Sequence, residues 1–297
     1  MSIGVIGAGK WGQALHFALS QENKECYITS RTKREIDNFL PLDEVVKMEY
    51  LVITIPAQEV SKWLQEHFSF QGQKILVASK GIEASSGRFL NEIYASYVPD
   101  DAISFLSGPS FAAEVMQSLP TALVVNSKNE QLAQTFASFF PSFIKTYVSD
   151  DVIGAEIAGA YKNVIAIAAG ICEGLSLGKN ASAALISRGL VEMHRFGMSY
   201  GAKEETFLGL SGSGDLFLTA SSTMSRNFRV GLGLAKGKKK EQIIKELGEV
   251  AEGIGTAYAL ERIAKDQGLY LPIATEVHAV LEGKEPKKSL RTLLTRS

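Results

Sequence analysis

The sequence is poor in the residues that build metal centres and disulfide frameworks. Its 297 residues include only two cysteines and four histidines. Cys26 and Cys172 lie in apolar segments without a CxxC spacing, so we expect buried free thiols. The histidines are scattered and form no HExxH-like pair, and we therefore predict no metal site.

An excess of one charge is also missing, as is a long apolar run. The formal net charge of −1 disfavours nucleic acid as a main partner, because a phosphate backbone calls for a basic excess. The most apolar stretch, residues 152–175, is interrupted by Glu156, Lys162, Asn163 and Glu173. No charged-then-apolar leader precedes the first expected strand. We expect a soluble cytoplasmic protein without membrane insertion.

The first half of the chain alternates short apolar runs with helical patterns. The expected strands are residues 3–8, 26–30, 50–57, 74–79, 103–107 and 121–127. They are rich in Val and Ile and apolar on both faces, which is typical of a parallel sheet covered by helices on both sides. Helical periodicity begins at Trp11 and at Val60. This pattern predicts a doubly wound fold with right-handed crossovers.

The second half contains no convincing strand after about Asp151. Helices are expected at residues 152–175, 180–200, 240–247, 254–267 and 273–282. The length suits two domains. We predict an α/β protein whose Rossmann-type dinucleotide-binding domain (residues 1–150), with a mostly parallel sheet, precedes an all-α substrate and catalytic domain (residues 151–297).

A glycine-rich turn follows the first expected strand directly and opens a helix. Gly7-Ala8-Gly9-Lys10-Trp11-Gly12 matches the GxGxxG pattern. The first glycine permits the tight turn, the second lets the backbone approach a pyrophosphate, and the third allows close packing of helix on strand. Free N–H groups and the partial positive charge of the helix N-terminus suit phosphates. A non-binding glycine-rich turn is the alternative.

The end of the second expected strand bears on the choice of cofactor. Arg31, Lys33 and Arg34 follow it, where an enzyme selective for NAD usually carries an acidic residue for the ribose hydroxyls. A guanidinium suits a 2′-phosphate. We favour NADP(H) and leave NAD(H) open, with a solvated basic turn as the alternative.

Two lysines and one aspartate are candidates for the chemistry. Lys80 ends an expected strand, where ligands of open α/β sheets bind. Lys162 lies in a strongly apolar helix, where an ammonium is costly unless it is paired or used, and where desolvation lowers its pKa toward that of a general acid. Asp215, after three small residues, could pair with Lys162. The alternatives are a surface role for Lys80, snorkelling for Lys162 and helix capping for Asp215.

Two further segments are candidates for substrate binding. Gly108 and Ser110 follow another strand, and Ser110 could cap the next helix. Arg226, beside Asn227, offers a bidentate fork for a phosphate.

Taken together, these segments resemble the bacterial-type NAD(P)-dependent glycerol-3-phosphate dehydrogenase family. The matching strings, in the family's order, are GAGKWGQALH, SKGIE, SGPSFAAEV followed by LPTA, AYKNVIAIAAG, LSGSGDLFLT, SRNFRVG and VAEGIGTA. They extend from residue 4 to about residue 257. The AYKNV, GSGDL and SRN strings are specific to this family, whereas the first is shared with many oxidoreductases.

The resemblance implies an activity and a set of roles. The activity is reversible reduction of dihydroxyacetone phosphate to sn-glycerol 3-phosphate, which feeds glycerophospholipid synthesis. Lys162 would be the proton donor and acceptor, with Asp215 as its partner, and Lys80 would contact the reacting oxygen or the substrate. The pocket for the phosphorylated substrate would comprise these three residues with Gly108, Ser110, Ser225, Arg226 and Asn227, supported by Asn163 and Thr219. The residues implied for the cofactor are Gly7, Gly9, Lys10, Trp11, Gly12, Arg31, Lys80, Ala112, Arg226, Val250 and Glu252.

Two features differ from the family pattern, and two rival functions stay open. The stretch between Arg31 and Tyr50 is short, which bears on the 2′-phosphate assignment, and Ala113 stands where many relatives have lysine. A 6-phosphogluconate or 3-hydroxyacid dehydrogenase would share the sheet and the helical half. A non-catalytic dinucleotide sensor would have no need of Lys80, Lys162 and Asp215 together. A homodimer is a family-level expectation.

Overall fold

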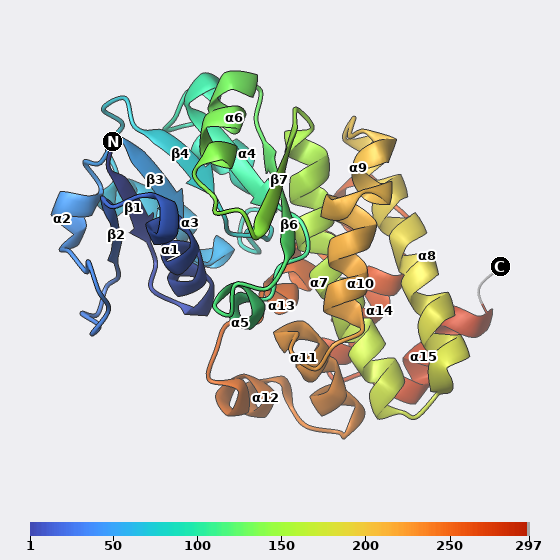
Figure 1. Ribbon diagram of the computed structural model, residues 1–297. Coiled ribbons are helices and arrows are strands. Elements are labelled where there is room, and N and C mark those ends of the chain that lie inside the picture. Colours follow the sequence, from blue (N-terminus) through green and yellow to red (C-terminus); the bar gives the residue numbers. More distant parts are fainter. Residues whose placement is uncertain (296–297) are drawn as a thin grey trace.

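The computed structural model describes residues 1–295 and contains a seven-stranded sheet followed by helices (Figure 1). The strand order is β2-β1-β3-β4-β5-β6-β7. The strands are β1 (Ile3–Ile6), β2 (Cys26–Thr29), β3 (Tyr50–Ile53), β4 (Lys74–Val77), β5 (Ile103–Ser107), β6 (Thr121–Asn126) and β7 (Ile144–Ser149). Every adjacent pair is parallel except β5 and β6, which run antiparallel.

The winding direction of the sheet reverses at β1. Ile3 is in register with Cys26 on one side and with Tyr50 on the other, so the chain leaves β1 for β2 and returns to β3 across it. In open α/β sheets, such a reversal leaves a crevice at the carboxyl ends of the strands, where ligands bind. The GxGxxG turn lies at the carboxyl end of β1, at this crevice.

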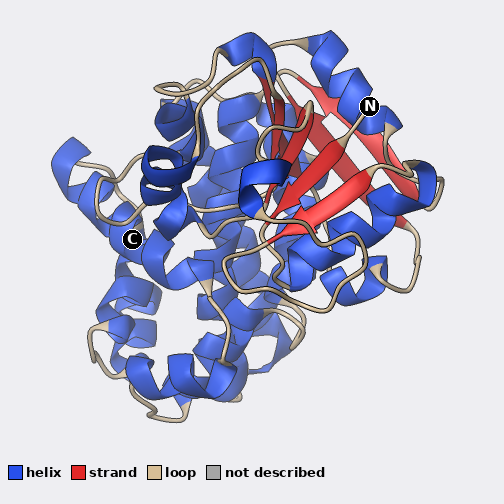
Figure 2. Ribbon diagram, turned by 90° about the vertical axis from the view of Figure 1, so that its left-hand side faces the viewer, coloured by secondary structure: helices blue, strands red, loops and turns tan. Residues whose placement is uncertain are grey.

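Helices cover both faces of the sheet, as Figure 2 shows. The helical elements of this half are α1 (Lys10–Glu22), α2 (Leu42–Val45), η1 (Ala57–Glu59), α3 (Val60–His67), α4 (Leu90–Tyr94), η2 (Asp100–Ala102), α5 (Ala112–Val115) and α6 (Glu130–Ser138). One core cluster joins Val5 and Leu76 to α1 and α6, and the other joins Ile53 and Val77 to α3 and α4. Burial on both faces explains why these strands read as continuous apolar runs.

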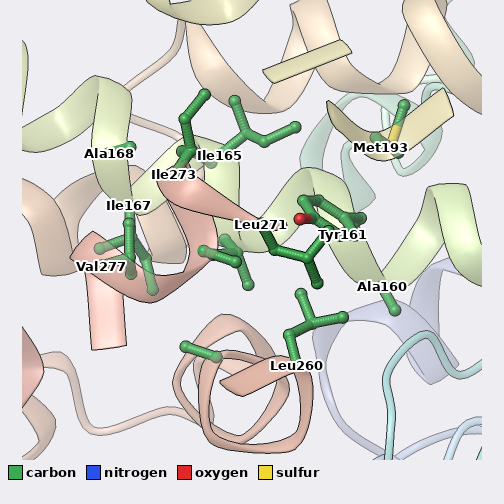
Figure 3. Packing of buried hydrophobic residues seen from close by; sticks show 14 of the residues in the cluster. Ala160, Tyr161, Ile165, Ile167, Ala168, Met193, Leu260, Leu271, Ile273 and Val277 are labelled. Atoms are coloured by element: carbon green, nitrogen blue, oxygen red, sulfur yellow. The ribbon is translucent and has the colours of Figure 1, made fainter. Parts of the chain in front are cut away.

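The second half is built around one buried helix, α7 (Val152–Gly174). The other elements are α8 (Gly178–Ser199), α9 (Glu204–Leu208), η3 (Leu210–Gly214, a π-helical turn), α10 (Asp215–Ala220), α11 (Arg226–Ala235), α12 (Lys240–Leu247), α13 (Glu252–Gln267), α14 (Pro272–Leu281) and α15 (Pro286–Thr295). Helices α8, α10, α11 and α13 pack against α7. Figure 3 shows Ile165 and Ile167 of α7 among side chains of the surrounding helices.

Two glycines let α7 and α11 cross at close range. A Cβ on Gly231 would lie 2.1 Å from the carbonyl oxygen of Ile167, and one on Gly170 would lie 2.1 Å from that of Phe228. A larger residue at either crossing position would separate the helices.

By length and composition α7 could span a membrane, but 94% of its most apolar window is buried, as in the core helix of a soluble protein.

The structure confirms the predicted fold class and differs in detail. All six expected strands are present, and helices occupy the five segments expected in the second half. The third strand ends at Ile53 rather than at residue 57, before Pro56. Strand β7 was not expected: it pairs only with β6 and is mostly exposed, so its sequence, IKTYVS, lacks the apolar run of a central strand. The short helices α9, α10 and α11 also lie outside the prediction.

Candidate active site

Three charged side chains meet where the sheet contacts the helical half. The Lys80 Nζ donates to Asp215 Oδ2 at 2.7 Å, and the Lys162 Nζ donates to Asp215 Oδ1. Lys162 also donates to Thr219 Oγ1 at 3.1 Å, and Lys80 donates to the Gly108 carbonyl at 3.1 Å. The pairing of Asp215 with Lys162 that the sequence suggested is therefore present.

Burial makes this cluster electrostatically strong. The side chains of Asp215, Lys162 and Lys80 are 1%, 9% and 17% exposed, so Lys162 does not snorkel to solvent. Desolvation lowers the pKa of Lys162 to about 8, against the opposing effect of Asp215. Burial alone would raise the pKa of Asp215, but the charges of Lys162 and Lys80 outweigh it and lower that pKa. An ionised aspartate thus holds an ammonium whose proton is easily transferred.

Glycines create the space for the lysines. A Cβ on Gly159 of α7 would lie 3.4 Å from Lys80 Cγ, so the stem of Lys80 lies directly over this helix, less than one turn before Lys162. Gly108 has φ +102° and would place a Cβ 2.9 Å from the Ala122 carbonyl, so only glycine fits there. This backbone conformation follows β5 and presents the Gly108 carbonyl to Lys80.

Ser110 does not cap the following helix. The N-cap of α5 is Phe111, without a side-chain hydrogen bond, and the Ser110 hydroxyl instead donates to the Gly108 carbonyl at 3.3 Å. The capping prediction is therefore wrong, because the helix begins one residue later than expected. Ser110 remains beside the carbonyl that holds Lys80.

The GxGxxG turn has the geometry that a pyrophosphate needs. Gly7 has φ +111°, and a Cβ on Gly12 would lie 1.8 Å from the Gly7 carbonyl oxygen, so both positions require glycine. A Cβ on Gly9 would meet nothing within 4 Å, so the backbone there is open to a ligand. No side chain caps α1, whose first-turn N–H groups point toward this space. Trp11 Nε1 donates to the Ala78 carbonyl at 3.1 Å, tying α1 to the end of β4.

Glu252 carries a buried oxygen without a partner among the described residues. Its Oε1 accepts from the Ala57 amide at 3.2 Å, whereas Oε2 is buried, unbonded and 3.3 Å from the position of a Cβ on Gly81. Burial raises the pKa of Glu252 to about 7. An orphaned acceptor close to Lys80 fits a polar group of the expected cofactor.

In the SRN segment, Ser225 and Asn227 make structural hydrogen bonds, whereas Arg226 is exposed. The Ser225 hydroxyl caps α11 by accepting from the Phe228 amide at 3.2 Å, and Asn227 Oδ1 accepts from the Gly253 amide at 3.0 Å. The side chain of Arg226 is 42% exposed, and its charge acts on Lys162 and Glu252. Its Nη1 lies 3.8 Å from Glu249 Oε2.

Glu249 is a charged residue of this region that the sequence patterns do not reveal. Its Oε1 accepts from Lys10 Nζ at 2.7 Å, so one carboxylate lies between the GxGxxG turn and Arg226. The hydrogen bond from Lys10 is the main cause of its lowered pKa. It stands in the loop after α12, directly before the VAEGIGTA string, and the string itself does not include it.

The remaining residues that were expected at the cofactor lie on separate elements of the fold. Ala112 begins α5, which packs against α1, and Val250 is 48% exposed just before α13. Arg31 is exposed in the loop after β2 and is separated from the strand of Lys80 by β1 and β3. The crossover from β2 to β3 contains only the one-turn helix α2.

Comparisons with known proteins match this architecture. The family model of the NAD-dependent glycerol-3-phosphate dehydrogenase N-terminus matches residues 35–133, and that of its C-terminus matches residues 151–291. A glycerol-3-phosphate dehydrogenase [NAD(P)+] of Sulfurimonas denitrificans is 71% identical, over 99% of both chains. The chain belongs to the NAD(P)-dependent glycerol-3-phosphate dehydrogenase family.

Other glycerol-3-phosphate dehydrogenases extend this relationship. The protein of that name from Nitratiruptor is 58% identical over 100% of this chain and 99% of its own. The crystal structure of glycerol-3-phosphate dehydrogenase from Coxiella burnetii superimposes with a TM-score of 0.92 at 31% identity, covering 99% of each chain. The yeast enzyme, at 24% identity and a TM-score of 0.80 over 100% of this chain and 99% of its own, shares the fold.

Proposed function

We propose that the protein catalyses the reversible reduction of dihydroxyacetone phosphate to sn-glycerol 3-phosphate with NADPH or NADH. The observation that carries this proposal is the buried Lys162–Asp215–Lys80 cluster, whose Lys80 follows a strand of the parallel sheet that carries the GxGxxG turn after β1. The turn, Trp11, Ala112, Val250 and Glu252 would hold the cofactor, which supplies or accepts a hydride when bound. We further propose that residues 1–150 form the dinucleotide-binding domain and residues 151–297, of which the last two lie outside the described residues, form the helical substrate and catalytic domain.

Lys162 is the general acid of the proposed reduction. As the carbonyl carbon is reduced, negative charge develops on its oxygen, and Lys80 and Lys162 stabilise that charge in a site with little water. Lys162 then donates its proton to the alkoxide. Asp215 orients both ammonium groups through its two oxygens. In the oxidative direction, neutral Lys162 accepts the proton from the substrate hydroxyl.

Arg226 is the proposed anchor for the substrate phosphate. Its guanidinium is accessible, whereas Ser225 and Asn227 hold the local backbone through the hydrogen bonds described above. A charge-assisted fork on the phosphate fixes the distant end of the substrate and so places its carbonyl at the lysines. Gly108 and Ser110 would line the pocket between these points.

Cofactor preference and cellular role complete the proposal. Basic Arg31, Lys33 and Arg34 after β2, in place of an acidic residue, favour NADP(H), with NAD(H) as the alternative. We also propose a cytoplasmic homodimer whose product enters glycerophospholipid synthesis.

Oxidation of NADPH and of NADH, followed at 340 nm with dihydroxyacetone phosphate, tests the proposed function. We expect turnover with at least one cofactor and none without substrate. Substrates of the 6-phosphogluconate and 3-hydroxyacid dehydrogenases, assayed in the oxidative direction, test the related activities. Cofactor binding without turnover on any of these substrates would favour a dinucleotide sensor and contradict the proposal.

A further inference from the structure

A buried hydrogen bond joins the sheet to the turn that carries Asp215. Ser107, the last residue of β5, and Ser211, in η3, have their hydroxyl oxygens 2.6 Å apart. Both side chains are almost fully buried, at 2% and 4% exposure. The proposed function does not use this contact, although Ser211 lies only four residues before Asp215.

The sheet side of this contact is held rigidly. Ser107 pairs with Val124 in the antiparallel ladder, and Asn126 Nδ2 donates to Ser107 Oγ at 2.8 Å. The same Asn126 amide reaches the Phe105 carbonyl at 3.0 Å. The Ser107 hydroxyl is therefore fixed by two strands before it meets Ser211.

The turn that leads to Asp215 has an uncommon backbone geometry. Residues Leu210–Gly214 form a π-helical turn, a geometry that is rare and frequent at functional sites. A Cβ on Gly212 would lie 2.3 Å from the Phe207 carbonyl oxygen, so the turn packs tightly against the end of α9. Helix α10 follows without a break and begins at Asp215. Any shift of the turn is therefore passed directly to the carboxylate.

Gly108, next to Ser107, holds Lys80, which is one of the two lysines bonded to Asp215. Gly108, the next residue, accepts from Lys80 Nζ, and Lys80 donates to Asp215. The end of β5 thus fixes Lys80 through a backbone carbonyl and fixes the Asp215 turn through a hydroxyl. This closed set of contacts sets the position of the carboxylate, supplied by the helical half, relative to the lysine of the sheet.

We infer that Ser107 and Ser211 are positioning residues that align Asp215 with Lys80 and Lys162 across the junction of the two halves. The inference rests on the proposed function, since alignment matters only if this cluster does the chemistry. Misplacement of a catalytic group by a fraction of an ångström lowers turnover much more than it lowers cofactor binding. Loss of the contact should also lower the kinetic pKa of Lys162, because Asp215 is the group that raises it.

The test compares Ser211→Ala with Ser213→Ala, in the same turn. The Ser213 side chain is partly exposed and its hydroxyl donates to the nearby Leu208 and Gly209 carbonyls, so this variant controls for general weakening of the turn. We expect Ser211→Ala to lower kcat roughly tenfold and to change KM for NADPH less than twofold. The pH at which kcat for reduction falls should move to a lower value in this variant alone.

Ser107→Ala and the double variant show whether one contact is responsible. If both serines act through the same hydrogen bond, the double variant loses no more activity than either single variant. The inference would be overturned if the activity losses of the two single variants multiply in the double variant. It would also be overturned if Ser211→Ala matches Ser213→Ala in kcat and in pH profile. A lower melting temperature with an unchanged pH profile in both single variants would also overturn it, by assigning a purely structural role. An inactive wild-type protein would instead contradict the proposed function.

Discussion

Lys80, at the end of a strand, and Lys162, in the central helix, donate to opposite oxygens of the Asp215 carboxylate. The contact links the two halves of the chain within a region of little solvent exposure. The two ammonium groups repel each other across one carboxylate, and the charge of Lys80 adds to the effect of burial in lowering the pKa of Lys162. The arrangement suits proton transfer better than it suits stability alone.

Replacing Lys162 with alanine should abolish most turnover while leaving the fold and the cofactor site intact. We expect kcat for dihydroxyacetone phosphate to fall about 10²–10⁴-fold, the usual contribution of a general acid. NADPH binding, measured by fluorescence, should change little. Lys179→Ala, at an 86% exposed lysine on the neighbouring helix, is the control. Normal turnover in Lys162→Ala would show that another group donates the proton.

The pH dependence of the two reaction directions should be opposite. Lys162 must be protonated to donate in reduction and neutral to accept in oxidation, and its pKa lies near 8 because of burial. We expect kcat for reduction to fall as pH rises through about 8, and kcat for oxidation to rise over the same interval. Profiles of both directions in one buffer series measure this. If kcat in both directions stays constant between pH 7 and 9 while the chemical step limits the rate, Lys162 is not the group that transfers the proton.

Arg226→Ala should weaken binding of the phosphorylated substrate more than any other step. Losing a charge-assisted fork costs about 1.5–3 kcal/mol, which corresponds to roughly a ten- to 150-fold rise in KM for dihydroxyacetone phosphate. Arg262→Ala, which removes an exposed guanidinium paired with Asp266 on α13, serves as the control. A rise below twofold in the Arg226 variant would place the phosphate elsewhere.

Glu156 makes stability depend on pH. It is buried on α7, accepts from the Asn91 amide at 2.7 Å, and burial raises its pKa from 4.5 to about 8. Because the folded-state pKa lies above the unfolded one, its contribution to stability is complete below about pH 4.5 and is lost as pH rises through about 8. Glu156→Gln keeps an acceptor but cannot ionise.

Thermal unfolding of this variant should therefore differ from wild type mainly at high pH. At pH 9 we expect a melting temperature at least ~3 °C above that of the wild type, with a much smaller difference at pH 5. Glu173→Gln, near the exposed end of the same helix, should show no such trend. Equal shifts at both pH values would indicate altered packing rather than ionisation.

Periodicity and glycine spacing predict the sheet and the central helix, because these elements are buried on all sides. They do not predict β7, whose exposed edge position leaves a mixed sequence. Lys162 could be singled out because an ammonium in an apolar helix demands a reason. Glu249 could not, since nothing in its own segment distinguishes it from an ordinary surface acid. Ser211 falls within a recognised string, but its contact with Ser107 depends on how the two halves pack.

The shared carboxylate also leaves the buried cluster with a charge imbalance. Lys80 and Lys162 supply two positive charges and Asp215 one negative charge, all largely removed from water. Such a surplus of one cation is unfavourable at rest, and an oxyanion forming between the lysines would cancel it. Ligands that mimic an alkoxide should thus bind more tightly than neutral analogues of the same shape. The site would therefore bind the transition state, in which the substrate oxygen becomes negative, more tightly than the neutral carbonyl.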